Sequence, residues 1–456
     1  MPEFALKREE VPYFSDVCDL FKRLRDLPDA ALLDSSHGAP RAGRFDIVVA
    51  RAAADSPPVL TGAAQDGASV RRHLGELQTY QRQRYRGIGA QDADLPFCGG
   101  LLGYISYDAG ALLHGITPAS AGEQPLVALR AYDACIIQDH LLQRSTLVNL
   151  PALPAPWRAD LLARLRQPPA AHEDAFTLLG RFQSRLGEQG YRRAFGRIAD
   201  YIRAGDCYQV NLAQCFSAPY RGEPFAAYRA LRRMAGAPFS GYVQQGDGAL
   251  LCLSPERFLS LRGRHVETRP IKGTRPRLDD PAADAAMASE LRHSPKDRAE
   301  NLMIVDLLRN DLGQSCLPGS IGVDALFEVE SYPTVHHLVS AISGELAPGR
   351  DALDLLRDAF PGGSITGAPK RRAMQIIAEL ENTPRQAYCG SLLYISADGR
   401  MDSNIAIRSL LMNGTEVRCW GGGGIVADSD CAAEHSETLD KVGRFLNCLE
   451  TEFSPT

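Results

Sequence analysis

The chain has 456 residues, of which 45% are hydrophobic and 23% charged, so it can bury a large core and has the length of two or three domains. Its net charge of -5 and the lack of a basic block interleaved with aromatic residues argue against a nucleic-acid partner. The sequence shows no apolar leader and no apolar run of about 18 residues, so we expect no membrane contact. Its 11 cysteines are scattered without a C-x-x-C pair, so we expect a cytoplasmic protein with reduced thiols.

Two segments in the first third of the chain predict strands. Residues 44–50 and 101–107 are rich in β-branched and aromatic side chains. Further along, residues 151–174 hold two clusters of proline and alanine around a short amphipathic helix, which is typical of a connector. We therefore expect an N-terminal region, residues 1–175, and a second region, residues 186–452.

The second region mixes helices with short strands. Hydrophobic residues recur at helical spacing between Tyr191 and Ile202. Strands are expected at residues 211–216, 251–253, 391–395 and 417–420. Hairpin-like strands with interspersed helices favour an α+β fold over a doubly wound parallel sheet.

The residues around Lys272 suggest that its side chain acts as a nucleophile. Pro270-Ile271 before it favours extended backbone and Gly273-Thr274 after it permits a sharp exit, so we expect the side chain to project from a strand end into a cleft. A lysine with its ordinary pKa of about 10.4 must be desolvated, or must have a neighbouring base, before it attacks carbon at neutral pH. The alternative is a structural lysine that snorkels at a strand end or pairs with a carboxylate.

Two predicted helices carry acidic side chains on one face each. The first is capped at Ser294 and runs to Gly313, and the second begins near Asp430. The side chains concerned are Asp297 and Glu300 on the first helix, and Glu434, Glu437 and Lys441 on the second. Acidic pairs from two helices can hold Mg²⁺ through oxygen ligands, and the alternative is that both are exposed helix faces.

Two glycine-rich stretches are candidates for ligand contact. Residues 362–370 precede a predicted helix and can present backbone N–H groups to a carboxylate, but Lys370 does not follow Gly367 directly, which argues against a nucleotide-binding loop. Residues 421–424 follow a predicted strand and either let a ligand approach the backbone closely or form a tight turn.

Six motifs in a fixed order identify a resemblance that spacing alone does not provide. These motifs are Ser254-Pro255-Glu256, Pro270 to Thr274, Asp297 to Gly313, Pro361 to Lys370, Asn404 to Arg408 and Gly421 to Lys441. Through them the chain resembles the chorismate-utilising enzymes, closely over residues 186–450 and more weakly in the first half. The resemblance implies an α+β, anthranilate synthase component I-like fold, in which antiparallel β-sheets pack as a sandwich with helices outside, and it makes residues 186–452 the chorismate-binding catalytic domain.

Lys272 separates the branches of this family. The anthranilate branch has alanine at this position and the aminodeoxychorismate branch has lysine, so the resemblance implies a transferase that aminates chorismate at C4 for p-aminobenzoate and folate synthesis. Gln209 matches the position at which the isochorismate and salicylate branches place a water-activating lysine, which argues against water as the nucleophile. The alternatives are an anthranilate synthase component I that carries lysine and a catalytically silent relative.

The resemblance also implies roles for individual residues. Glu256 matches the general acid, Lys272 the nucleophile and His337 a histidine near the leaving hydroxyl group. Glu300 and Glu437 match direct ligands of Mg²⁺, with Glu434 and Asp297 beside them. The positions expected to contact the substrate are Gln209, Thr274, Thr366, Tyr388, Arg408, Gly422, Gly423, Gly424 and Lys441. Asp297 is shorter than the glutamate of some relatives, and Gln314 replaces a common arginine.

The resemblance implies several partners. The chain shows no glutaminase domain of its own, so we expect ammonia to come from a separate glutamine amidotransferase subunit. Residues 33–35 resemble the tryptophan pocket of the anthranilate branch, which suggests that Ser35 binds tryptophan in the N-terminal region.

Overall fold

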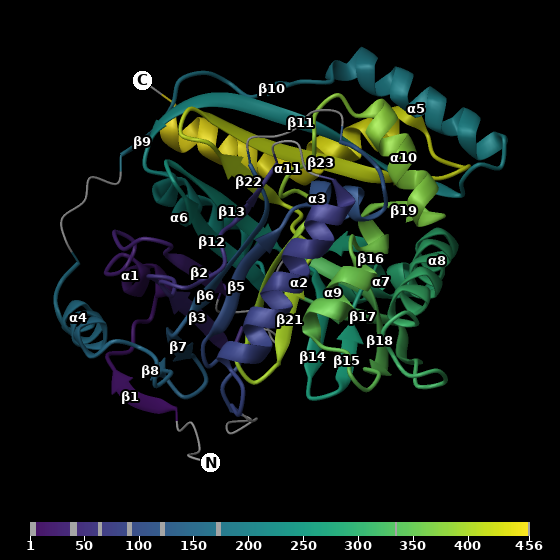
Figure 1. Cartoon of the computed structure of the whole chain (residues 1–456). Coiled ribbons are helices and arrows are strands. Elements are labelled where there is room, and N and C mark those ends of the chain that lie inside the picture. Colours follow the sequence, from purple (N-terminus) through teal and green to yellow (C-terminus); the bar gives the residue numbers. More distant parts are fainter. Residues whose placement is uncertain are drawn as a thin grey trace.

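The computed structural model describes residues 6–36, 43–62, 66–88, 94–118, 124–169, 175–332 and 335–454. Within these ranges every strand pair is antiparallel, and the strands form two large sheets (Figure 1). The first sheet has 13 strands in the order β1, β8, β7, β3, β2, β12, β13, β22, β23, β11 and β10, with β9 and β19 also paired to β11. The second has 10 strands in the order β16, β18, β15, β14, β21, β20, β5, β6 and β4, with β17 paired to β18.

The strands of the first sheet are β1 (Lys7–Val11), β2 (Ala31–Asp34), β3 (Phe45–Val49), β7 (Ala134–Asp139), β8 (Arg144–Asn149), β9 (Phe176–Leu178), β10 (Gln183–Ser184), β11 (Gln209–Gly222), β12 (Phe239–Gln245), β13 (Gly248–Ser254), β19 (Gly367–Ala368), β22 (Ser409–Met412) and β23 (Glu416–Ile425). Those of the second sheet are β4 (Leu60–Thr61), β5 (Gly100–Ile105), β6 (Pro125–Tyr132), β14 (Arg257–Arg262), β15 (His265–Thr268), β16 (Ile271–Pro276), β17 (Gly322–Ser331), β18 (Val335–Glu345), β20 (Ser391–Ser396) and β21 (Met401–Asn404).

The helices are α1 (Val17–Phe21), α2 (Gly67–Arg84), α3 (Tyr107–Leu113), α4 (Ala155–Arg166), α5 (Gly187–Arg203), α6 (Pro224–Ala235), α7 (Pro281–His293), α8 (Pro295–Leu312), α9 (Ala352–Ala359), α10 (Lys370–Leu380) and α11 (Cys431–Phe453), with a 3₁₀ turn, η1 (Gly363–Ile365). Helix α11 packs along β23 at one end of the molecule, whereas α7 and α8 lie beside β16 and β18 (Figure 1).

Both sheets contain strands from before and after the predicted connector. Strand β2 pairs with β12 in the first sheet, and β5 pairs with β20 in the second. The two predicted regions, residues 1–175 and 186–452, therefore share both sheets. Helix α4 lies where the short connector helix is expected, and residues 170–174 lie outside the described part of the chain.

The largest hydrophobic core joins the two sheets. It contains Leu250 and Leu411 from the first sheet together with Leu259 and Leu393 from the second. A second cluster, on the same side of the first sheet as α1, α6 and α11, includes Phe225. Burial of the apolar faces of the two sheets is the main contribution to the stability of the fold. Helices on the outside are needed to cover the faces that the sheets do not bury against each other.

Local chemistry explains where several predicted elements end. Helix α8 begins as expected, because the Ser294 hydroxyl accepts a hydrogen bond from the Asp297 N–H at 3.3 Å. The strand predicted at residues 101–107 ends earlier, because the Ser106 hydroxyl accepts from the Ala109 N–H at 3.1 Å and starts α3.

The turn interpretation of residues 421–424 is wrong. These glycines continue β23 as an extended strand and pair with β11. A Cβ atom at Gly421 would lie 2.5 Å from the Thr438 carbonyl oxygen, and one at Gly424 would lie 2.4 Å from Gln209 Nε2. Close approach of α11 and of a neighbouring side chain therefore requires glycine here.

Candidate active site

Three elements bring the predicted acid and nucleophile together. Glu256 lies between β13 and β14, Lys272 lies on β16, and Ser364 lies in η1. The Ser364 hydroxyl donates to Glu256 Oε1 at 3.0 Å, and Lys272 Nζ donates to the Ser364 carbonyl oxygen at 3.1 Å. One serine thus contacts both side chains.

Burial favours the uncharged forms of both side chains. It raises the pKa of Glu256, which is 6% exposed, and the ammonium group of Lys272 opposes this only in part. Burial also lowers the pKa of Lys272, and the carboxylates of Glu256 and Glu300 oppose this only in part. A general acid needs a protonated carboxyl group and an amine nucleophile needs a neutral amine, so both pKa shifts are in the direction that these roles require.

His337 faces Thr274, two residues beyond Lys272 on β16, as a neutral imidazole. Its Nδ1 lies 2.9 Å from Thr274 Oγ1, because these residues face each other across β16 and β18. Burial lowers the pKa of His337 to about 4, and the charge of Arg408 adds to this. The imidazole can therefore exchange hydrogen bonds at neutral pH but is not an imidazolium acid.

The acidic residues of α8 and α11 approach the same nucleophile. Glu300 and Glu437 both act electrostatically on Lys272. Asp297 accepts a hydrogen bond from Arg275 at 2.9 Å, and Glu437 pairs with Lys441 at 2.6 Å. Two of the four predicted ligands thus have basic partners.

The remaining two acids have the charge environment that suits a cation. Burial raises the pKa of Glu300; the nearby Lys272 and Lys296 oppose this in part, and the carboxylates of Asp297 and Glu434 add to it. Burial likewise raises the pKa of Glu434, and Glu437 adds to this. Hard oxygen donors that repel one another fit Mg²⁺. In the described ranges no group of three or more His, Cys, Asp or Glu side chains is arranged to hold a metal ion, so the ligand set stays a prediction.

Arg408 has the features of an anion-binding residue. Its backbone has φ of 50°, and among the described residues no carboxylate forms an ion pair with its guanidinium group. Burial lowers its pKa, and Arg444 adds to this while Glu256 opposes it. A partly buried guanidinium without an ion pair among the described residues suits a substrate carboxylate.

The other predicted substrate contacts surround β23. Lys441 Nζ donates to the Gly422 carbonyl oxygen at 2.9 Å, and a Cβ at Gly423 would lie 3.1 Å from Glu434 Oε2. Gln209 is 2% exposed, and its Oε1 is buried without a hydrogen-bond partner. A buried acceptor without a partner is a candidate ligand contact.

Thr366 and Tyr388 have structural partners. The Thr366 hydroxyl donates to the Gly362 carbonyl oxygen at 3.1 Å, within its own loop. Tyr388 stacks on Trp420 with ring centroids 6.0 Å apart. Their roles toward a substrate stay predictions.

Ser35 lies in a separate buried polar network. Its N–H and hydroxyl both donate to Asp46 Oδ1, at 2.8 and 2.7 Å, and Asp46 also contacts His140. None of these contacts reaches Lys272 or Glu256. Tryptophan binding at Ser35 stays a prediction.

Sequence reasoning missed the buried arginine that holds η1. Arg385 is 1% exposed, pairs with Glu381 at 2.7 Å and donates to the Ile365 carbonyl oxygen at 2.9 Å. The (i, i+4) spacing of Glu381 and Arg385 is a signal that could have suggested a pair, but spacing alone does not show burial.

Replacing Arg385 with methionine should therefore destabilise the fold. The change leaves the Glu381 carboxylate buried without its partner, so we expect the free energy of unfolding, measured by chemical denaturation, to fall by about 3–5 kcal/mol. Arg192→Met, which breaks an exposed pair with Glu188, is the control and should leave it nearly unchanged. Equal effects of the two changes would contradict a special role for the buried pair.

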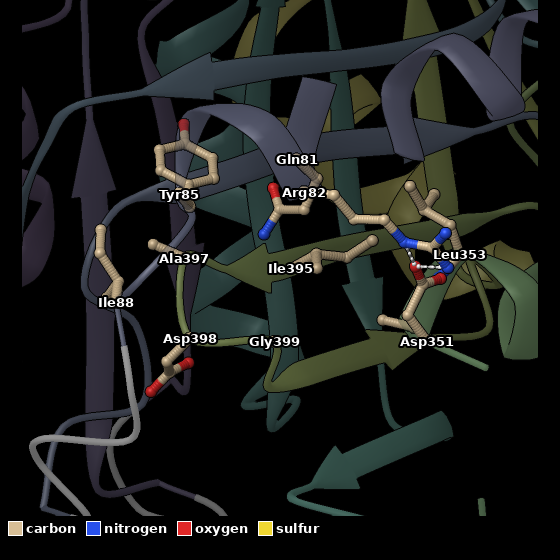
Figure 2. Close-up of a pocket in the computed structure, with 11 residues that line it drawn as sticks. Gln81, Arg82, Tyr85, Ile88, Asp351, Leu353, Ile395, Ala397, Asp398 and Gly399 are labelled. Carbon is tan, nitrogen blue, oxygen red and sulfur yellow. Dashed lines mark hydrogen bonds and ion pairs between the residues drawn. The ribbon is translucent and has the colours of Figure 1, made fainter. Parts of the chain in front are cut away.

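A separate cavity of about 240 Å³ lies between α2, the start of α9 and the turn after β20 (Figure 2). Gln81 and Ile395 line it between Tyr85 on one side and Arg82, which donates to Asp351, on the other. None of the residues that line it belongs to the set around Lys272, so it is not the site of the predicted chemistry.

The family described as chorismate binding enzyme matches residues 41–447. Aminodeoxychorismate synthase component 1 of Klebsiella aerogenes is 45% identical over 450 residues, covering 97% of this chain and 98% of the relative. The protein of the same name from Escherichia coli (strain K12) is 44% identical, covering 94% and 95%. Anthranilate synthase component 1 of Streptomyces coelicolor is 40% identical, covering 78% and 73%.

Solved structures show the same fold. Anthranilate synthase component I from Streptococcus pneumoniae superposes with a TM-score of 0.75 at 28% identity, covering 89% of this chain and 92% of that one. The menaquinone-specific isochorismate synthase from Escherichia coli gives 0.73 at 19% identity, covering 98% and 95%, and shows the fold alone. The predicted α+β fold of antiparallel sheets is confirmed. No helix among the described residues is long and apolar enough to cross a membrane.

Proposed function

Since this chain belongs to the family of chorismate-binding enzymes, we propose that it is the large subunit of an aminodeoxychorismate synthase, a transferase that aminates chorismate at C4. Three relatives of that name match nearly the whole chain at 44–45% identity, whereas two anthranilate synthases are 34–40% identical and a more distant relative of the first name, from Bacillus subtilis, is 33% identical. The product would serve p-aminobenzoate and folate synthesis.

The contact of Ser364 with both Glu256 and Lys272 is the observation that carries this proposal. It places a carboxyl group with a raised pKa and an amine with a lowered pKa around one residue. An anthranilate-type or water-adding mechanism has no use for an amine at this position. A mechanism in which the lysine itself attacks the ring requires that amine.

In the first half-reaction, the neutral amine of Lys272 forms a bond to C2 of chorismate. The two ring double bonds shift, the bond from C4 to its hydroxyl oxygen breaks, and Glu256 gives its proton to that oxygen, so that water leaves. The adduct nitrogen keeps both its protons and a positive charge, and Glu256 is left as a carboxylate.

In the second half-reaction, ammonia forms a bond to C4 and the double bonds shift back. The C2–nitrogen bond breaks, and Lys272 leaves as a neutral amine. The new ammonium group at C4 returns one proton to Glu256, so that acid and nucleophile both regain their starting states. The enolpyruvyl group is untouched.

The other predicted residues would bind and orient the substrate. Mg²⁺ held by Glu300 and Glu437, with Glu434 and Asp297 beside them, would supply positive charge to the ring carboxylate. The unpaired guanidinium of Arg408 suits the second carboxylate. Neutral His337 can hydrogen-bond the C4 hydroxyl group as it leaves.

The names of the relatives point to a partner. "Component 1" implies another component, and we propose that it is a glutamine amidotransferase that supplies ammonia. We also propose that the protein is cytoplasmic and that it holds tryptophan near Ser35.

Product analysis tests the function directly. Purified protein is incubated with chorismate, MgCl₂ and an ammonium salt, and the products are identified by chromatography and mass spectrometry. We expect 4-amino-4-deoxychorismate, which retains the enolpyruvyl group. Anthranilate with released pyruvate would instead support the second family branch, and no product would support a silent relative. Glutamine in place of ammonium should give product only when the amidotransferase subunit is added.

A further inference from the structure

Ser364 contacts the acid and the nucleophile through two different groups. Its hydroxyl donates to Glu256 Oε1 at 3.0 Å, and its carbonyl oxygen accepts from Lys272 Nζ at 3.1 Å. The residue is 5% exposed, so bulk water does not compete for these hydrogen bonds. We infer that Ser364 is a positioning residue, which directs the proton of Glu256 to Oε2 and orients the lone pair of the Lys272 amine.

The hydroxyl decides which oxygen of Glu256 carries the proton. An oxygen that accepts a hydrogen bond from a serine is favoured as the acceptor, so the acidic proton resides on the other oxygen, Oε2. That leaves Oε2 as the proton donor for a leaving hydroxyl group. Without the serine, the proton would be distributed over both oxygens.

The carbonyl group orients the nucleophile. A neutral amine has two N–H bonds and one lone pair. When Lys272 donates one N–H to the Ser364 carbonyl oxygen, rotation of the amine is restricted and the lone pair points away from η1.

The loop that holds Ser364 is itself tightly fixed. Arg385 donates to the Ile365 carbonyl oxygen at 2.9 Å, and the Thr366 hydroxyl donates within the same loop. A Cβ atom at Gly363 would lie 2.5 Å from the Leu307 side chain, so η1 packs directly on α8. The orientation of Ser364 is therefore preset before substrate binds.

Three further groups act electrostatically on Glu256 or respond to its charge. Lys272 faces it from β16, Arg408 from the segment before β22, and the Cys389 thiol from the segment before β20. The Ser364 hydrogen bond favours the carboxylate, as do the two basic groups and a hydrogen bond from the Ile271 backbone N–H. Removal of the hydroxyl should therefore raise the pKa of Glu256 further, while the basic groups stay in place.

The test is the pH dependence of kcat/KM for chorismate in Ser364→Ala, with ammonium as the nitrogen source. We expect the maximal kcat/KM to fall about ten- to a hundredfold. The high-pH limb of the profile, where Glu256 loses its proton, should move to higher pH by about one pH unit. Ser364→Thr retains the hydroxyl and should keep the wild-type limb. A residue needed only for structure would lower the rate at every pH without moving either limb, and that result would overturn the inference.

This inference rests on the proposed function, and the wild-type enzyme separates the two. If the wild type forms no C4-aminated product, the proposed function fails. If it does and both limbs stay in place in Ser364→Ala, only the role of Ser364 fails. Should Ser364→Ala not fold by circular dichroism, Ser364→Cys replaces it, because the thiol is a weaker donor and should move the same limb by a smaller amount. An unmoved limb in a folded Cys variant overturns the inference equally.

Discussion

Lys272→Ala should lose C4 amination of chorismate by at least about a thousandfold, because the variant has no amine that can bond to C2. The change removes one half-buried side chain, which among the described residues hydrogen-bonds the Ser364 carbonyl group, so the fold should persist. The measurement is the rate of aminodeoxychorismate formation with excess ammonium. Lys7→Ala, at an exposed position on β1, is the matched control and should be fully active.

A second measurement on the wild type addresses the intermediate. When chorismate is added without ammonia, the intact mass of the quenched protein should include a fraction that carries the ring, and peptide mapping should place it on Lys272. Wild-type turnover in Lys272→Ala would remove this side chain from the mechanism. Anthranilate as the product of the variant would show that Lys272 determines which ring carbon is aminated.

Glu300→Gln should weaken Mg²⁺ binding and abolish most Mg²⁺-dependent activity. The substitution keeps the size of the side chain but removes the negative charge that Mg²⁺ requires. Loss of a partner outside the direct ligands costs about 10–100-fold in metal affinity, so loss of a direct ligand should cost at least as much. Isothermal titration of the protein with MgCl₂ alone measures this without reference to turnover.

Asp306→Asn is the matched control for Glu300→Gln. Asp306 lies on the same helix, is largely exposed and pairs with Arg309 at 3.1 Å, so its loss should change neither Mg²⁺ binding nor rate. An unaltered titration curve in Glu300→Gln would eliminate α8 from the metal site. Activity lost with metal binding intact would instead assign Glu300 to substrate orientation.

The sequence predicted local structure well where a single residue type decides it. Ser294 followed by Pro295 starts α8, and Asp430 starts α11, because each side chain accepts hydrogen bonds from the first free N–H groups. The same local reasoning misplaced the end of β5, since the cap at Ser106 was overlooked within an apolar run. It also left two interpretations of residues 421–424, because nothing local distinguishes a glycine turn from a glycine strand.

The order of the motifs and the presence of Lys272 were enough to identify the family and to favour one branch within it, since both depend on residue identity alone. Tertiary structure decided the rest. Only packing brings Ser364 to Lys272 and Glu256, from 92 and 108 positions away. Only the folded environment, through burial and the charge of Arg408, lowers the pKa of His337 to about 4 and makes the imidazole neutral. Desolvation and hydrogen bonding between distant segments depend on the folded environment, which no local pattern of residues contains.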